Sequence, residues 1–173
     1  MAPPARRDKQ QKARKDGKEV ISLFDQDELL KVISSKHAIK IYNWMALHPD
    51  TTMENIPFAQ WCVPRAATKT IMDDFVISTS TVVESFESNR GDTTKLLVEL
   101  HDGHRVETVI MRHKKRSTVC VSSQVGCQMG CRFCATGTMG IIGDLTAFEI
   151  LEQFIHAQKV SKLRNAGNCE YLS

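Results

Sequence analysis

A cluster of cysteines between residues 117 and 137 constrains this chain more than any other part of its sequence. Three of the cysteines follow the spacing C-x3-C-x2-C, namely Cys127, Cys131 and Cys134, and a fourth, Cys120, lies seven residues upstream. Four of the chain's six cysteines therefore fall within fifteen residues. Thiols this close in sequence converge on one point only where the backbone loops around it, and the glycines interspersed among them permit such a loop.

Convergent thiolates predict a metal site, because they are soft ligands that select zinc, copper(I) or iron–sulfur clusters. A four-iron cluster normally takes four cysteines, so three would leave one iron open to a further ligand. A structural zinc site usually shows two separated ligand pairs, but there is no second C-x2-C here, and neither His113 nor His156 is at zinc-finger spacing. The spacing therefore favours an iron–sulfur cluster over zinc, and zinc over purely structural cysteines.

The longer string CVSSQVGCQMGCRFCATG resembles one branch of the radical S-adenosylmethionine (SAM) enzymes, the RlmN/Cfr-type methyltransferases. The aromatic Phe133 before the last cysteine and the upstream segment GHRVETVIMRHKKRSTVCVSSQVGC match the same branch, and the resemblance runs from about Leu23 to about Arg164. Members of this branch methylate an adenine of ribosomal RNA at ring carbon 2 or 8, and the RlmN group also methylates transfer RNA. The sequence favours the carbon 2 branch.

The resemblance implies a role for each matching residue. Cys127, Cys131 and Cys134 would hold a [4Fe-4S] cluster. SAM would chelate the open iron through its amino and carboxylate groups, with Phe133 packed near its adenine. Cys120 would help to resolve a protein–RNA crosslink, and Glu107 would accept a proton.

The resemblance also implies a reaction and its partners. In this branch a reduced cluster cleaves SAM to a 5′-deoxyadenosyl radical, which activates a methyl group that a C-terminal cysteine received from another SAM. That methyl group then adds to the adenine. The implied partners are ribosomal RNA, transfer RNA as a second substrate, and an electron donor of flavodoxin or ferredoxin type.

The positive charge of the chain lies at its N-terminus. The formal net charge is +3, but residues 1–20 carry seven Lys or Arg and three Asp or Glu, while the remaining 153 residues carry sixteen and seventeen. The body is therefore not a basic nucleic-acid module by charge alone. We expect residues 1–20 to form a basic disordered tail, with a specific RNA contact as the alternative.

The same tail bears on location. It is rich in Lys and Arg but has no serine and no apolar run, whereas transit peptides are rich in both arginine and serine and poor in acidic residues. We expect neither a signal peptide nor a membrane span. Reduced thiols agree with a reducing compartment. We therefore predict a cytoplasmic chain without membrane contact, with a plastid or mitochondrion as the alternative.

Residues 21–75 are predicted to form a small helical accessory domain, which the family implicates in positioning RNA. Helix start signals occur at three places: Asp25-x-x-Glu28, Ser35 and Thr51-x-x-Glu54. Pro49 ends the second of these segments and Pro64 the third. Three further residues are expected in the core rather than in a ligand site: Trp44, Trp61 and Cys62.

Residues 76–116 are predicted to form a small antiparallel sheet, with turns at Asn89–Asp92 and at Asp102-Gly103. In the last strand, alternation puts Glu107, Val109 and Met111 on one face and Val106, Thr108 and Ile110 on the other. By pattern alone, Glu107 is a solvated strand residue. Only the match of VETV to the family makes it a candidate for catalysis.

The run Arg112–Arg116, RHKKR, lies between this sheet and the cysteines. A run of exposed cations is usually a solvated loop. Beside an RNA-modifying site it would also suit phosphate, because Lys and Arg supply the sequence-independent part of nucleic-acid affinity. The sequence leaves both alternatives open.

Residues 117–173 are predicted to begin a radical SAM domain. Thr118–Ser122 alternates like a strand, with Cys120 and Ser122 on one face, and sites in βα barrels form at the carboxyl ends of strands, where the cysteine loop lies. If this is the first barrel strand, the face that bears Cys120 is the interior one.

A helix is predicted to follow the cysteine loop. Thr146-x-x-Glu149 is a capping box, and Phe148, Leu151 and Ile155 follow at helical spacing, so they form its buried face. His156 is expected to be exposed.

The predicted fold class is thus an α+β N-terminal region, made of a small helical domain and an antiparallel sheet, followed by the first βα unit of an incomplete radical SAM barrel. After Arg164 the sequence reads NAGNCEYLS and shows neither the further βα units nor the methyl-carrying cysteine of the family; Cys169 does not match that position. We therefore expect a truncated chain that is inactive alone. The alternatives are a non-enzymatic zinc- or RNA-binding module and an inert truncated product.

Overall fold

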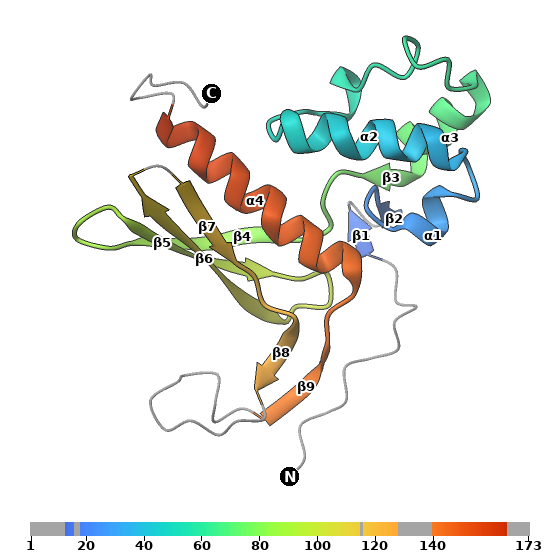
Figure 1. The fold of residues 1–173 in the computed structure, drawn as a ribbon. Coiled ribbons are helices and arrows are strands. Elements are labelled where there is room, and N and C mark those ends of the chain that lie inside the picture. Colours follow the sequence, from blue (N-terminus) through green and yellow to red (C-terminus); the bar gives the residue numbers. More distant parts are fainter. Residues whose placement is uncertain (1–12, 16–17, 115, 128–139, 166–173) are drawn as a thin grey trace.

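The computed structural model describes residues 13–15, 18–114, 116–127 and 140–165 (Figure 1). It combines a helical region with antiparallel sheets, and one long helix runs between them. Of the helices in this described part of the chain, none has both the length and the apolar character needed to cross a membrane.

The helical region, residues 18–76, is enclosed by two short parallel strands, β2 (Lys18–Ser22) and β3 (Phe75–Val76). A further strand, β1 (Ala13–Lys15), pairs antiparallel with β2. The helical elements between β2 and β3 are α1 (Gln26–Leu29), α2 (Ser35–Leu47), the 3-10 helix η1 (Met53–Asn55) and α3 (Arg65–Asp74). The predicted helical content of this stretch is therefore confirmed.

The predicted helix boundaries are only partly confirmed. The Asp25 side chain accepts a hydrogen bond from the Glu28 N–H at 3.2 Å and caps α1 as expected. Helix α2 is preceded by Ser34 rather than capped by Ser35, and the Ser34 hydroxyl lies 3.1 Å from Nδ1 of His37. Pro64 does not end a helix but stands immediately before α3, where proline costs no helical hydrogen bond.

The segment from Thr51 forms only the single 3-10 turn η1, so the predicted third capping box is wrong. Trp44 and Trp61 are half-buried and pack against the core of the helical region, with their rings edge to face at 5.9 Å. Cys62 is exposed and has a positive φ of 56°. The expectation that Cys62 is a core residue is therefore wrong, because a turn carries its side chain outward.

The second region is a four-stranded antiparallel sheet in the order β4-β5-β6-β7. Its strands are β4 (Thr81–Glu87), β5 (Thr93–Glu99), β6 (Arg105–His113) and β7 (Arg116–Cys120). Both predicted turns are confirmed, and Gly91 and Gly103 take the positive φ that such turns need. A separate hairpin pairs β8 (Gln124–Cys127) with β9 (Gly140–Asp144).

Strand β7, the predicted first strand of the barrel, pairs antiparallel with β6 within the described residues. Cys120, the last residue of β7, is exposed.

Helix α4 (Ala147–Asn165) begins with the predicted capping box. The Glu149 carboxylate accepts hydrogen bonds from the Thr146 N–H at 2.7 Å and the Thr146 hydroxyl at 2.8 Å. The helix contributes to both apolar cores, with Ile155 in the core of the helical region and Ala157 in the core beneath the sheet. Figure 1 shows it running between the two regions.

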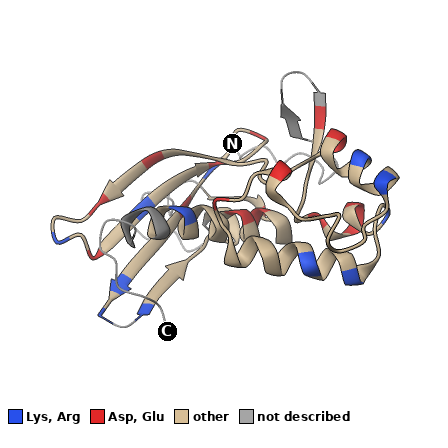
Figure 2. Cartoon of the chain, turned by 90° about the horizontal axis from the view of Figure 1, so that it is seen from above, with Lys and Arg blue, Asp and Glu red and all other residues tan. Residues whose placement is uncertain are grey.

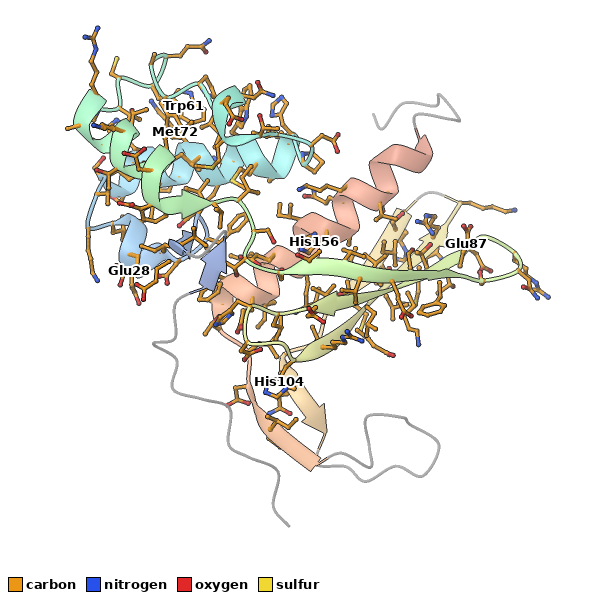
Figure 3. All side chains as sticks on the ribbon, turned by 180° about the vertical axis from the view of Figure 1, so that it is seen from behind. Glu28, Trp61, Met72, Glu87, His104 and His156 are labelled. Atoms are coloured by element: carbon orange, nitrogen blue, oxygen red, sulfur yellow. The ribbon has the colours of Figure 1, made fainter. Side chains whose placement is uncertain are left out.

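The buried face of α4 is largely polar, which the apolar spacing did not predict. Its buried polar side chains are Glu149, Glu152, Gln153 and His156. Leu151, expected to be buried, is 45% exposed. His156, expected to be exposed, is 8% exposed, and its Nε2 lies 3.1 Å from the Ser78 hydroxyl and 3.0 Å from the Ser80 hydroxyl (Figure 3).

Stability should fall at mildly acidic pH because of His156. Burial lowers the pKa of this side chain below its ordinary value of 6.5; Glu152 opposes the shift, whereas Lys159 adds to it. The folded state therefore favours neutral His156, and stability present above pH 6.5 is lost as the pH falls from 6.5 towards the lower folded pKa. Urea unfolding at pH 7.5 and 5.5 should show this loss. It should shrink in His156→Phe and persist in the exposed control His113→Phe; equal pH dependence in all three proteins would contradict the assignment.

Candidate catalytic face and cysteine loop

The face of the four-stranded sheet that points away from α4 carries Glu107. Along β6 the burial alternates, with Val106, Thr108 and Ile110 buried against α4 and the residues between them half-buried. This is the division that the sequence predicts. Glu107 therefore lies on the open face, with 40% of its side chain exposed.

Glu107 is paired with a lysine from the neighbouring strand. The Lys95 Nζ donates to Glu107 Oε1 at 3.0 Å and lies 5.5 Å from the centroid of the Phe86 ring. At this exposure such a pair contributes at most about 1 kcal/mol to stability. Its effect is local: it ties the Glu107 carboxylate to the neighbouring strand β5.

Cys120 lies on the same face as Glu107. It pairs directly with Val109, and directly opposed residues of antiparallel strands project their side chains to the same side. Glu107 is two positions from Val109, so it is a diagonal neighbour of Cys120, at roughly 7–8 Å in such sheets. The structure thus brings the two predicted catalytic residues together on one exposed surface, Cys120 from the last position of β7 and Glu107 from the middle of β6.

The chain beyond Cys120 is held by Gln153 of α4. The Gln153 carboxamide accepts from the Ser122 N–H at 2.9 Å and donates to the Ser122 carbonyl at 3.0 Å, as a neighbouring strand would. Its Oε1 also accepts from the Thr108 hydroxyl at 2.9 Å. The Ser122 hydroxyl in turn donates to the carbonyl of Glu107 at 2.7 Å. These contacts fix the exit of β7 against β6 and α4.

The base of the cysteine loop is a pair of glycines. Cys127, the last residue of β8, pairs with Gly140, the first of β9, and Gly126 beside it has φ +80°. A Cβ on Gly126 would overlap the carbonyl oxygen of Gly140, so this close approach requires glycine. The two ends of residues 128–139 are thereby held together.

The other predicted cofactor residues, Cys131, Phe133 and Cys134, lie outside the described residues. Among the residues that the structure does describe, no group of three or more His, Cys, Asp or Glu side chains is placed to hold a metal. The residues of the motif nevertheless fit a soft metal centre, because they offer three thiols within a segment whose ends are closed by the β8–β9 pairing.

The basic run 112–116 spans the end of β6 and the start of β7, at the end of the sheet remote from Cys120. His113, Lys114 and Arg116 are exposed there. Figure 2 shows basic residues at this tip. Arg112 differs, because its Nη1 donates to the Thr94 hydroxyl at 2.7 Å inside the sheet. The exposed part of the run is therefore open to solvent or to a phosphate group.

Two residues of this site were missed by the sequence interpretation. Lys95 could have been found by counting outward from the Asp102-Gly103 turn, which places it opposite Val109. Gln153 gave no signal, because a glutamine on a helix is ordinarily solvated and its partners lie 31 and 45 positions away.

In fold and in sequence the chain is similar to a radical SAM methyltransferase of known structure. Searched against models of protein families, the chain matches none. Among solved structures it is similar to a radical SAM methyltransferase from Sphaerobacter thermophilus, with a TM-score of 0.62 and 32% identity over 86% of this chain and 42% of that chain.

The more specific similarity is to the RlmN proteins, as the sequence resemblance predicted. The probable dual-specificity RNA methyltransferase RlmN of Clostridium botulinum (strain Loch Maree / Type A3) is 37% identical over 145 residues, which cover 79% of this chain and 40% of the relative. The corresponding protein of Dictyoglomus thermophilum is 38% identical over 145 residues. RlmN 1 of Myxococcus xanthus is 54% identical over 84 residues, or 49% of this chain and 23% of the relative. The chain spans about 40% of the length of the first two relatives.

Replacing Gly126 with alanine should destabilise the protein more than replacing Gly103. Both glycines have φ near +80°, so each substitution costs about 1–2 kcal/mol of backbone strain. A Cβ at position 103 meets nothing within 4 Å, whereas at position 126 it meets backbone. Urea unfolding should show the larger loss for Gly126→Ala, with faster amide exchange at Ile141 and Gly143. Equal losses in the two variants would show that the β8–β9 approach is not tight.

Replacing Gln153 with leucine should lower the free energy of unfolding by about 3 kcal/mol, because the N–H and carbonyl of Ser122 and the hydroxyl of Thr108 lose their partner. The control, Gln60→Leu at an exposed position, should change it by less than about 0.5 kcal/mol. Denaturant unfolding of the two variants measures both values. A similar small change in both would mean that Gln153 does not hold the exit of β7.

Proposed function

We propose that this chain forms part of an RlmN-type radical SAM methyltransferase that methylates an adenine of RNA. The observation that carries the proposal is the similarity over 145 residues to dual-specificity RNA methyltransferases. The matched stretch covers 79% of the chain. A stretch of that length contains Glu107, Cys120 and the three-cysteine motif whichever residue it starts from. Carbon 2 is the proposed position, with ribosomal RNA as the substrate and transfer RNA as a second one.

The proposed cofactors are a [4Fe-4S] cluster and SAM. Cys127, Cys131 and Cys134 would hold the cluster, and Phe133 would pack beside SAM. Bound and reduced by a flavodoxin- or ferredoxin-like donor, the cluster supplies one-electron cleavage of SAM. Since the ends of residues 128–139 meet at the Cys127–Gly140 pair, the motif would be presented beside the exit of β7.

The chain's own residues would act on the open face of the sheet. Glu107 would accept a proton at its carboxylate, with Lys95 holding that carboxylate in place. Cys120, exposed on the same face, would help to resolve the crosslink between protein and RNA. An RNA adenine that contacts both Glu107 and Cys120 must lie over this face, because α4 covers the opposite face of the sheet.

The division of labour along the chain is part of the proposal. Residues 21–75 would form an accessory domain that positions RNA, residues 76–116 the sheet, and residues 117–173 the opening strand, loop and helix of the radical SAM barrel. The disorder expected for residues 1–20 does not hold for strand β1 (Ala13–Lys15) or for the start of β2 (Lys18–Ser22). The exposed cations at the tip of β6 and β7 would contact phosphate. Thiols that must stay reduced suit the cytoplasm.

Anaerobic reconstitution with iron and sulfide tests the cluster. We expect about four irons per chain and a low-temperature EPR spectrum that SAM alters. Single alanine variants of Cys127, Cys131 and Cys134 should lose the cluster. The control Cys62→Ala should keep it, because Cys62 is an exposed thiol in the helical region. Stoichiometric zinc without labile sulfide would contradict the proposal and favour the non-enzymatic zinc- or RNA-binding module.

A further inference from the structure

Glu152, in the second turn of α4, is a buried carboxylate that the proposed reaction does not use. It has no exposed surface. Charged side chains are almost never fully buried unless they are paired or extensively hydrogen-bonded, because burial removes their hydration. The hydrogen bonds of this carboxylate therefore indicate its structural role.

Both oxygens of Glu152 accept a backbone N–H and a short hydroxyl hydrogen bond. Oε1 accepts from the Thr79 N–H at 3.0 Å and from the Ser22 hydroxyl at 2.6 Å. Oε2 accepts from the Ser80 N–H at 2.9 Å and from the Ser80 hydroxyl at 2.6 Å. The hydroxyls of Ser78 and Thr79 add further contacts at 3.1–3.2 Å.

The segment Ser78–Ser80 therefore forms an anion-binding loop, and the anion is the chain's own carboxylate. Two successive backbone N–H groups with neighbouring hydroxyls are the donors that such sites use. His156, one turn further along α4, also contacts this loop, with its Nε2 close to the hydroxyls of Ser78 and Ser80.

The donors come from the helical region and from the segment that joins it to the sheet. Ser22 is the last residue of β2 in the helical region, and Ser78–Ser80 lies in the connection from β3 to β4. The next residue of α4, Gln153, is bonded instead to Thr108 and Ser122 on the side of the sheet. Glu152 and Gln153, adjacent on one helix, thus bind the helical region and the sheet respectively. Figure 3 labels His156, which lies at the same junction.

We propose that Glu152 is a positioning residue, which fixes the orientation of the helical region relative to the sheet face of Glu107 and Cys120 by filling the anion-binding loop at Ser78–Ser80. This role goes beyond the proposed methyl transfer and does not depend on it. Whatever the helical region presents to that face, its distance and angle are set through α4.

Substituting Glu152 with glutamine tests the role at nearly constant size. Hydroxyl donors can turn to suit an amide, but backbone N–H groups cannot, and each oxygen of Glu152 accepts one of them. The amide nitrogen would therefore face an N–H. We expect the amides of Thr79 and Ser80 to exchange with solvent about tenfold faster or more in E152Q, with those of Leu96 and Ile110 unchanged.

Residual dipolar couplings of the full chain separate positioning from folding. In the unaltered protein, amides of α2 and of β5 should fit one alignment tensor. In E152Q each set should still fit its own tensor, but the two tensors should differ. The control E84Q, the same change at an exposed carboxylate of β4, should behave as the unaltered protein does.

A second variant decides the matter if E152Q does not fold. Combining Ser22→Ala with Ser80→Ala removes the two hydroxyl contacts of 2.6 Å without creating an unmatched N–H. Separate alignment tensors for α2 and β5 in this folded variant would support the proposal. A single shared tensor in either variant would overturn it and leave Glu152 with no part in orienting the regions.

Discussion

The polar face of α4 is the constraint on which the arrangement of the molecule depends. An apolar helix face can slide or rotate on its neighbours at modest cost, but buried carboxylate and amide groups are stabilised only where specific donors and acceptors meet them. Glu152 and Gln153 face different partners from adjacent positions, so one rotation and one axial position of the helix satisfy both. The apolar residues of α4 then complete the core of the helical region and the core beneath the sheet, whose relative orientation these polar contacts already fix.

The features that the sequence predicted correctly are local ones. The Asp25 and Thr146 caps and the Asp102-Gly103 hairpin each depend on residues within a few positions of one another, and all three are present. Not every local signal was correct, since the segment from Thr51 forms only a 3-10 turn. The predictions of burial along α4 failed because they needed distant information. The burial of His156 depends on serines 76 and 78 positions away.

The candidate site was predictable to a similar extent. Alternation along β6 gave the face of Glu107, and the pairing of β7 with β6 put Cys120 on it. Glu107 became a candidate only through the family resemblance, because no sequence pattern distinguishes a catalytic glutamate on a strand from a solvated one. Lys95 followed from the hairpin register, whereas Gln153 became visible only when α4 was placed against the sheet.

The close approach of Gly126 and Gly140 has a consequence for engineering. A segment whose two ends meet in one backbone pair behaves as a cassette: its length and sequence can change without altering the distance that the scaffold must span. Residues 128–139 are joined to the described structure in this way. Loops with other ligand spacings could therefore be grafted between these two glycines, so that one scaffold would display different metal-binding peptides beside the same sheet.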